Sequence, residues 1–153
     1  RNNDGDTPLH LASVGSFSEL VELLMDQGAN LDAPNEDGDT PLHKVCKNLN
    51  SESGIEHARL LLDRGANVDA RNRKGRTPLH AAGTVEAVSL LLDQDASLEA
   101  RDNEGSTPLH IACSNDGNVE VASFLLSRGA DVEAANNMGW RPLHCAVLND
   151  NNN

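Results

Sequence analysis

Apolar residues recur along this chain in short clusters whose spacing is typical of amphipathic helices rather than of strands. Residues 20–24 read Leu-Val-Glu-Leu-Leu, which places apolar side chains on one side of a helix. Gly28 follows, and glycine commonly ends a helix because it adopts the left-handed conformation without strain. A shorter apolar segment, residues 9–12, precedes this helix, with a polar turn between the two. The pattern therefore predicts pairs of short helices joined by turns.

Polar residues before each apolar segment predict where the helices begin. Thr7 can cap the first helix, and Pro8 suits its first turn because a helix start leaves that N–H unused. Ser16, followed three residues later by Glu19, forms a capping-box pattern that predicts the start of the second helix. Residues 53–56 carry the same Ser and Glu spacing and predict another such start.

One tetrapeptide recurs through the whole chain. Thr-Pro-Leu-His occupies residues 7–10, 40–43, 77–80 and 107–110, and Arg-Pro-Leu-His occupies residues 141–144. The intervals are 33, 37, 30 and 34 residues, and each copy follows a glycine. A period of about 33 residues that carries Thr-Pro-Leu-His-x-Ala is the signature of ankyrin repeats. The chain resembles the ankyrin repeat family over essentially its whole length.

This resemblance implies an all-α fold: an ankyrin-repeat α-solenoid of stacked antiparallel helix pairs, from which β-hairpin loops project. We expect a single domain, residues 1–153, with repeats at about 1–34, 35–71, 72–101 and 102–135 and a partial fifth repeat at 136–153. Because both ends fall inside a repeat, we expect the chain to be a fragment of a longer protein. The Asn-rich end, residues 149–153, is expected to be poorly ordered.

The repeats are not equal in length. Repeat two has four extra residues between its helices, around residues 48–52, whereas repeat three lacks three residues at the same junction. The first helix of repeat three is therefore expected to be the shortest. Repeat three also has Asp95 where the others have glycine after the second helix. A left-handed conformation at Asp95 costs roughly 1 kcal/mol, so we predict that Asp95→Gly raises the melting temperature.

Composition and charge narrow the class of partner. The net charge of −12 opposes binding to nucleic acid, which needs a basic surface, and to anionic membranes. No apolar run is long enough for a membrane span, and the first residues lack the pattern of a signal peptide. The three cysteines lack the spacing of a disulfide framework. We therefore expect an intracellular, cytoplasmic protein, with the nucleus as an alternative location.

The five histidines of the tetrapeptide have two interpretations. They could form a row of ligands or bases, or each could tie the backbone of a hairpin to the Thr hydroxyl. Neighbouring copies stand roughly 10 Å apart, the usual spacing of packed helices, which is too far to share a metal ion. We prefer the structural role, and the family resemblance implies the same hydrogen bonds. His57 lies on a second helix and has no obvious partner.

Other groups of polar residues give little indication of a metal site or of catalysis. His-x-x-Cys at residues 43–46 and 110–113 could put two ligands on one helix face, but the two pairs stand two repeats apart, so buried inert thiols are the preferred interpretation. Asp-Gly-Asp at residues 4–6 and 37–39 resembles part of a calcium loop, but no bidentate Glu follows at the right distance. No phosphate loop or nucleophile elbow occurs. We predict no cofactor, no metal site, no catalytic residue and no enzymatic activity.

The positions that differ between repeats predict where a partner binds. They are the hairpin tips, the residue after each glycine and the residue after each histidine. In ankyrin-like stacks the tips and inner helices line one concave groove, so the resemblance implies that these positions form the recognition surface. The candidate partner-binding residues are Asp39, Lys44, Arg73, Lys74, Arg76, Ser106, Ile111, Met138, Trp140 and Arg141.

Charged and aromatic residues along this surface indicate the kind of partner. Arg73, Lys74 and Arg76 make repeat three basic, which predicts contact with an acidic segment of a protein or peptide. Alternatively, these tips only neutralise the acidic residues 36–37 of repeat two, an interaction of about 0–1 kcal/mol. Trp140 is of a residue type enriched at interfaces, or else a following repeat half-buries it.

Two functions are consistent with these residues. The first is a non-catalytic protein–protein interaction module of the adaptor or scaffold type, which binds through the hairpin tips and the concave helix face. The alternative is a targeting or regulatory domain of a larger enzyme, channel or ligase whose active part lies outside residues 1–153. The length of the parent chain would discriminate between them.

Overall fold

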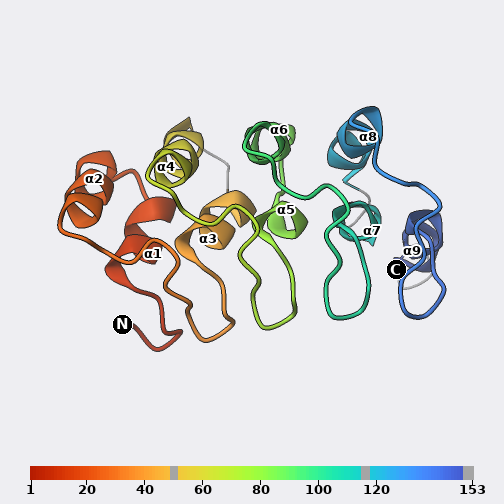
Figure 1. The fold of residues 1–153 in the computed structure, drawn as a ribbon, viewed down its shortest axis with the longest axis horizontal. Helices are drawn as coiled ribbons and strands as arrows, with labels where there is room; N and C mark the ends of the chain where they lie inside the picture. The colour runs from red at the N-terminus through yellow and green to blue at the C-terminus, as the bar shows by residue number, and fades with distance from the viewer. Residues whose placement is uncertain (49–51, 115–117, 150–153) are drawn as a thin grey trace.

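The described part of the chain, residues 1–48, 52–114 and 118–149, consists of nine helices and their connecting loops, with no strand. In the computed structural model the helices are α1 (Pro8–Val14), α2 (Ser18–Asp26), α3 (Pro41–Lys47), α4 (Glu52–Asp63), α5 (Pro78–Ala81), α6 (Val85–Asp93), α7 (Pro108–Ser114), α8 (Val119–Ser127) and α9 (Pro142–Asn149). The odd-numbered, inner helices form one row, the even-numbered, outer helices form a second, and the loops between repeats project beyond the inner row (Figure 1). The predicted all-α solenoid is confirmed. None of the described helices is long and apolar enough to cross a membrane.

The repeated tetrapeptide begins the inner helix of each repeat. In α1, Pro8 is the first helical residue and Thr7 is the N-cap, in an extended conformation. The Thr7 hydroxyl accepts a hydrogen bond from the backbone N–H of His10, and His10 Nδ1 accepts one from the Thr7 N–H at 3.1 Å. Thr40 and Thr77 donate their N–H to the matching histidine in the same way. The predicted capping by threonine is confirmed.

Two positions after the last residue of each outer helix, the chain adopts the left-handed conformation. Gly28 has a φ of 78°, and the next residue, Ala29, donates its N–H back to the Leu24 carbonyl at 3.0 Å. Asp95 takes the same position after α6 with a φ of 60°, and it is the one non-glycine residue with positive φ in the described segments. The predicted left-handed conformation of Asp95 is therefore confirmed.

The predicted start of α2 is wrong. The helix begins at Ser18, and its N-cap, Phe17, forms no side-chain capping bond. The Phe17 carbonyl accepts the N–H groups of Leu20 and Val21 at 3.0 Å, so the first turn closes without the expected box between Ser16 and Glu19. Ser18 instead directs its hydroxyl at His57 of the next repeat, 2.9 Å from the ring Nε2. A tertiary contact thus replaces the local one.

The predicted start of α4 is also wrong, for a different reason. The helix begins at Glu52, so Ser53 lies inside it and cannot be its N-cap. With 12 residues α4 exceeds α2, α6 and α8, which have nine each. The insertion of repeat two therefore partly extends the outer helix, while residues 49–51 fall outside the described segments. In repeat three α5 has four residues and is the shortest described helix, as predicted.

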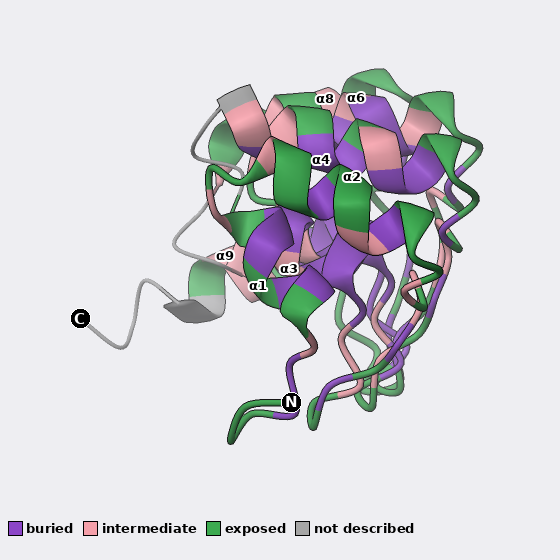
Figure 2. Cartoon of the chain, turned by 90° about the vertical axis from the view of Figure 1, so that its left-hand side faces the viewer, coloured by how far each residue is buried: buried purple, intermediate pink, exposed green. Residues whose placement is uncertain are grey.

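The core is a continuous layer between the two rows of helices. Buried residues lie where the rows face each other, and exposed residues cover the outer sides and the loop tips (Figure 2). The leucines of the four Thr-Pro-Leu-His copies are at most 2% exposed: Leu9, Leu42, Leu79 and Leu109. Ala58 and Ala87, on the outer helices, are fully buried, because small side chains let adjacent repeats approach closely. This thin core positions the loops at regular intervals. The Asn-rich residues 150–153 lie outside the described segments.

Candidate functional site

The histidine of each Thr-Pro-Leu-His copy uses both ring nitrogens, one within its own repeat and the other to reach the next repeat. His10 Nε2 donates to the Asp39 carbonyl at 2.9 Å, while Nδ1 accepts the N–H of its own threonine. The corresponding acceptors for the next three histidines are the carbonyls of Arg76, Ser106 and Trp140, at 2.9–3.0 Å. A carbonyl can only accept, so each of these rings carries its proton on Nε2. Neither nitrogen is free for a metal or for proton transfer, which supports the structural interpretation.

His57 has two partners, so the expectation that it has none is wrong. Its ring is buried, with Nδ1 3.0 Å from the Ser13 carbonyl and Nε2 2.9 Å from the Ser18 hydroxyl. Nδ1 must donate to the carbonyl, and the hydroxyl then donates to Nε2. Both partners belong to the preceding repeat, Ser13 in α1 and Ser18 in α2, so His57 joins the first two repeats.

The cysteines are poor nucleophiles. Cys46 is fully buried, and burial raises the pKa of its thiol to about 12. Burial also raises the pKa values of Cys113 and Cys145, and for Cys113 the neighbouring Cys145 thiol adds to the effect. A raised pKa leaves little thiolate at neutral pH. Within the described segments, no group of three or more His, Cys, Asp or Glu side chains could hold a metal ion.

The loops form a rigid row because each is bonded to itself and to the next. The Asn72 side chain accepts the backbone N–H groups of Lys74 and Arg76 at 3.0 Å within its own loop. Between loops, the Arg73 N–H donates to the Asp37 carbonyl at 2.9 Å. The same backbone bond joins every successive pair, with donors Glu36, Arg73, Asn103 and Asn137. Side chains at the tips are therefore presented on a fixed frame.

Two of the arginines near the basic repeat belong to that frame. Arg71 donates to the Arg101 carbonyl at 2.8 Å, and Arg101 donates to the Ala135 carbonyl at 2.8 Å, each in the next loop along. Arg101 also donates to the Gly105 carbonyl of its own loop at 3.1 Å. Arg71 and Arg101 thus hold neighbouring loops together, and the tip residues Arg73 and Lys74 remain available to a partner.

Two adjoining hollows lie on the groove face, the surface formed by the projecting loops and the inner helices. The first, of about 420 Å³, is lined by Arg76, Glu104, Ser106, Ile111, Met138, Trp140 and Cys145, among others. The second, of about 250 Å³, is lined by Asp37, Asp39, Lys47, Arg73, Lys74, Arg76, Ala81 and Ile111, among others. The single turn of α5 ends at Ala81, and this small residue lines the second hollow. Arg76 and Ile111 line both hollows.

Eight of the ten candidate partner-binding residues line these hollows; Lys44 and Arg141 do not. The candidate list omitted other lining residues, among them Lys47 and Glu104. Lys47 lies three positions after Lys44 on the same helix, and this spacing places both on one helix face. Glu104 is at a hairpin tip, and the tips are among the positions expected to bind a partner. Both residues could therefore have been predicted from the sequence.

Three ion pairs of the candidate residues join adjacent repeats or loops. Lys44 pairs with Asp6 at 3.0 Å, and Arg76 pairs with Asp102 at 3.1 Å; each carboxylate side chain is 2% exposed. Burial alone raises the pKa of Asp6, but hydrogen bonds from Asn35 and Lys44 outweigh burial and hold this pKa below its ordinary value. Arg141 pairs at 2.7 Å with Glu133, which is largely exposed.

The tips of repeats two and three do not neutralise each other through ion pairs. No ion pair within the described segments joins Glu36 or Asp37 to the cations of repeat three. These tips are joined instead by the backbone bond from the Arg73 N–H to the Asp37 carbonyl. Arg73 and Lys74 are exposed, and neither forms an ion pair within the described part of the chain.

Comparison with known proteins agrees with this geometry. A family model described as ankyrin repeats, in three copies, matches residues 1–72, 51–136 and 104–153. No curated protein matches the chain significantly. Ankyrin repeat domains are generally protein–protein interaction modules without catalytic activity. The matched segments together span the whole sequence, and the chain belongs to the ankyrin repeat family.

Proposed function

We propose that this chain is a non-catalytic module of the adaptor or scaffold type, which binds a protein or peptide partner through its hairpin tips and groove face. One observation carries the proposal: eight of the ten candidate residues at variable positions line two adjoining hollows, and the two hollows share Arg76 and Ile111. The repeated side chains face inward, into helix caps and bonds between loops. The positions that differ between repeats therefore lie on an accessible surface that contains hollows.

The charge of the second hollow favours an acidic segment of the partner. Lys47, Arg73, Lys74 and Arg76 outnumber the two acidic lining residues, Asp37 and Asp39, although the whole chain has a net charge of −12. Salt screens charges beyond about 8 Å under physiological conditions, so an approaching segment responds to this local excess more than to the net charge. Complementary charge mainly increases the rate and specificity of association.

We place this function in the cytoplasm. Cys46, Cys113 and Cys145 are all free thiols, in keeping with a reducing compartment.

Affinity capture from cell extract tests the proposal with two matched variants. The test variant, R73E/K74E/W140A, reverses two exposed tip cations and truncates Trp140, which is 39% exposed. Arg76 is left unchanged because it also pairs with buried Asp102.

The control variant, R59E/R64E/L126A, makes the same kinds of change on the outer helices α4 and α8 and the turn after α4. We expect the wild type and the control to retain the same specific partner and the test variant to lose it. Equal capture by all three proteins would contradict binding through the groove face.

A further inference from the structure

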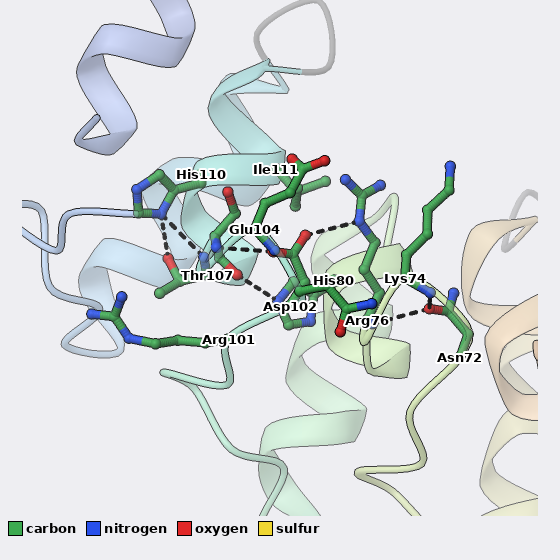
Figure 3. Close-up of polar contacts among 12 residues, drawn as sticks. Asn72, Lys74, Arg76, His80, Arg101, Asp102, Glu104, Thr107, His110 and Ile111 are labelled. Carbon is green, nitrogen blue, oxygen red and sulfur yellow. Dashed lines mark hydrogen bonds and ion pairs between the residues drawn. The ribbon is translucent and has the colours of Figure 1, made fainter. Parts of the chain in front are cut away.

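Arg76 is held in one orientation by a buried carboxylate. Its Nε lies 3.1 Å from Asp102 Oδ2, and the Asp102 side chain is 2% exposed. Asp102 is itself fixed, because its other oxygen accepts the backbone N–H groups of Glu104 and Ser106 at 2.9 Å. Figure 3 shows this chain of bonds leading from the loop of repeat four to Arg76 in repeat three. The guanidinium is therefore positioned before any partner arrives.

The bond to Asp102 leaves the two terminal NH₂ groups of Arg76 available. In the described segments the guanidinium makes no other hydrogen bond or ion pair, and the side chain is 31% exposed. Two parallel N–H donors on a planar guanidinium match the two oxygens of a carboxylate. Lys44, which follows a tetrapeptide histidine, offers a contrast: its ammonium also binds a buried carboxylate, that of Asp6, but it has no planar pair of donors. Of the two, only Arg76 presents two parallel donors in one plane.

An apolar patch adjoins this donor face. Arg76, Ile111, Met138 and Trp140 line the same 420 Å³ hollow, and Met138 and Trp140 are 59% and 39% exposed. A hollow of this volume falls within the usual range of ligand pockets, and Trp is enriched among residues that dominate binding energy. The hollow can therefore receive a bulky apolar side chain next to a carboxylate on Arg76.

We propose that the partner presents a short motif to this surface: an acidic residue whose carboxylate binds the Arg76 terminal NH₂ groups, next to a bulky apolar residue in the hollow of Met138 and Trp140. This inference rests on the proposed function and specifies its partner chemistry. In Figure 3 the side chains of Lys74, Arg76 and Glu104 extend in the same direction. Glu104 repels a second carboxylate, so the acidic residue approaches from the Lys74 side.

Peptide display supplies the probe for the test. Random 12-residue peptides are selected against the wild-type chain, and the selected peptide is synthesised with its acidic residue intact and as the Gln or Asn analogue. We expect the selected sequences to share an acidic residue close to Leu, Ile, Met, Phe or Trp. We expect the amide analogue to bind the wild type about tenfold more weakly, because a charge-assisted pair becomes a neutral one.

Variants of the chain then assign the motif to its residues. With R76Q the acidic peptide and its amide analogue should bind within about twofold of each other. The reason is that R76Q has already removed the contact that the amide analogue would lose. R76K keeps a charge for Asp102 but lacks the paired donors, and it should lose most of the discrimination. W140A should weaken both peptides equally and leave their ratio unchanged, whereas E104Q should tighten the acidic peptide. Thermal unfolding of each variant confirms that it is folded.

The results distinguish a failure of the proposed motif from a failure of the proposed function. If peptides bind the groove face without a shared acidic residue, or if R76Q and R76K discriminate as the wild type does, the proposed motif is overturned while a protein-binding function stands. If neither display nor affinity capture yields a binder that depends on the groove face, the proposed function fails and the motif fails with it.

Discussion

The histidine of each Thr-Pro-Leu-His copy is the most prominent polar group in the sequence and the least available to a ligand. Its ring accepts a backbone N–H at the helix start and donates to a carbonyl in the next loop. Local spacing predicted the first bond, because Thr and His lie three residues apart on one helical turn. The second bond spans about one repeat; the sequence indicated a bond to hairpin backbone, as did the family resemblance, but not which carbonyl accepts it. The residues beside the histidines line the groove face instead.

Acid should weaken the fold through these histidines. Burial lowers the pKa values of His10, His43 and His80 below the ordinary value of 6.5, and the backbone bonds only partly oppose it. The unfolded chain therefore takes up protons at a higher pH than the folded chain, so stability is retained above pH 6.5 and falls as the pH decreases below it. Urea unfolding between pH 7.5 and pH 5 measures this slope. Replacing His43 with Gln should flatten it, and an equal slope in the wild type and the variant would refute the assignment.

Asp95 should limit the stability of repeat three. Its φ of 60° strains a residue with a Cβ, and glycine relieves about 1 kcal/mol there. Asp95→Gly is therefore expected to raise the free energy of unfolding by about that amount, as measured in urea. Gly65→Asp provides the reverse control, because Gly65 has a φ of 92° and a Cβ there would meet nothing within 4 Å. A loss of stability in the first variant would show that the Asp95 side chain stabilises the turn.

At the scale of the helix, the sequence predicts where the inner helices begin better than where the outer helices begin. The Thr-Pro pair caps locally, so the starts of α1, α3 and α5 follow from neighbouring residues alone. The Ser-x-x-Glu pattern misplaced two outer helices because their first turns are decided elsewhere: Ser18 binds His57 in the next repeat, and α4 extends into the insertion. Contacts between repeats, rather than local propensity, set these boundaries.

Among the outer helices, α6 has a side-chain cap that can be tested. The Thr84 hydroxyl accepts the Ala87 N–H at 3.2 Å. Thr84→Ala should therefore lower the free energy of unfolding by about 1 kcal/mol, the usual cost of removing an N-cap. Ser16→Ala is the matched control, since α2 has no side-chain cap, and it should leave stability nearly unchanged. Equal losses from the two substitutions in urea unfolding would contradict these helix starts.

At the scale of the whole molecule, the stack is held by contacts that repeat from one unit to the next. Each loop is joined to its neighbour by a backbone bond, and two buried carboxylates, Asp6 and Asp102, pair with cations of an adjacent repeat. The sequence indicated the stack through its period, but it assigned Lys44 and Arg76 to binding alone. Their pairing was not predictable, because it depends on how far each repeat is displaced along the stack.

Buried and exposed ion pairs between repeats should differ sharply in importance. Asp102→Ala leaves the Arg76 charge and two backbone N–H groups unpaired, and it should cost about 3 kcal/mol of unfolding free energy. Asp26→Ala removes the exposed pair with Arg64, whose side chains are 61% and 41% exposed, and should cost about 0–1 kcal/mol. Urea unfolding of both variants measures the contrast. Similar losses would mean that the buried pair contributes no more than a surface one.

Hydrogen–deuterium exchange with and without a bound partner tests the central claim most directly. If variable side chains of the groove face form one recognition surface, the captured protein or the selected peptide should slow exchange in residues 36–47, 72–81, 103–114 and 136–141. The outer helices α2, α4, α6 and α8 should exchange as in the free chain. Protection confined to the outer helices, with the loops and inner helices unchanged, would contradict the account.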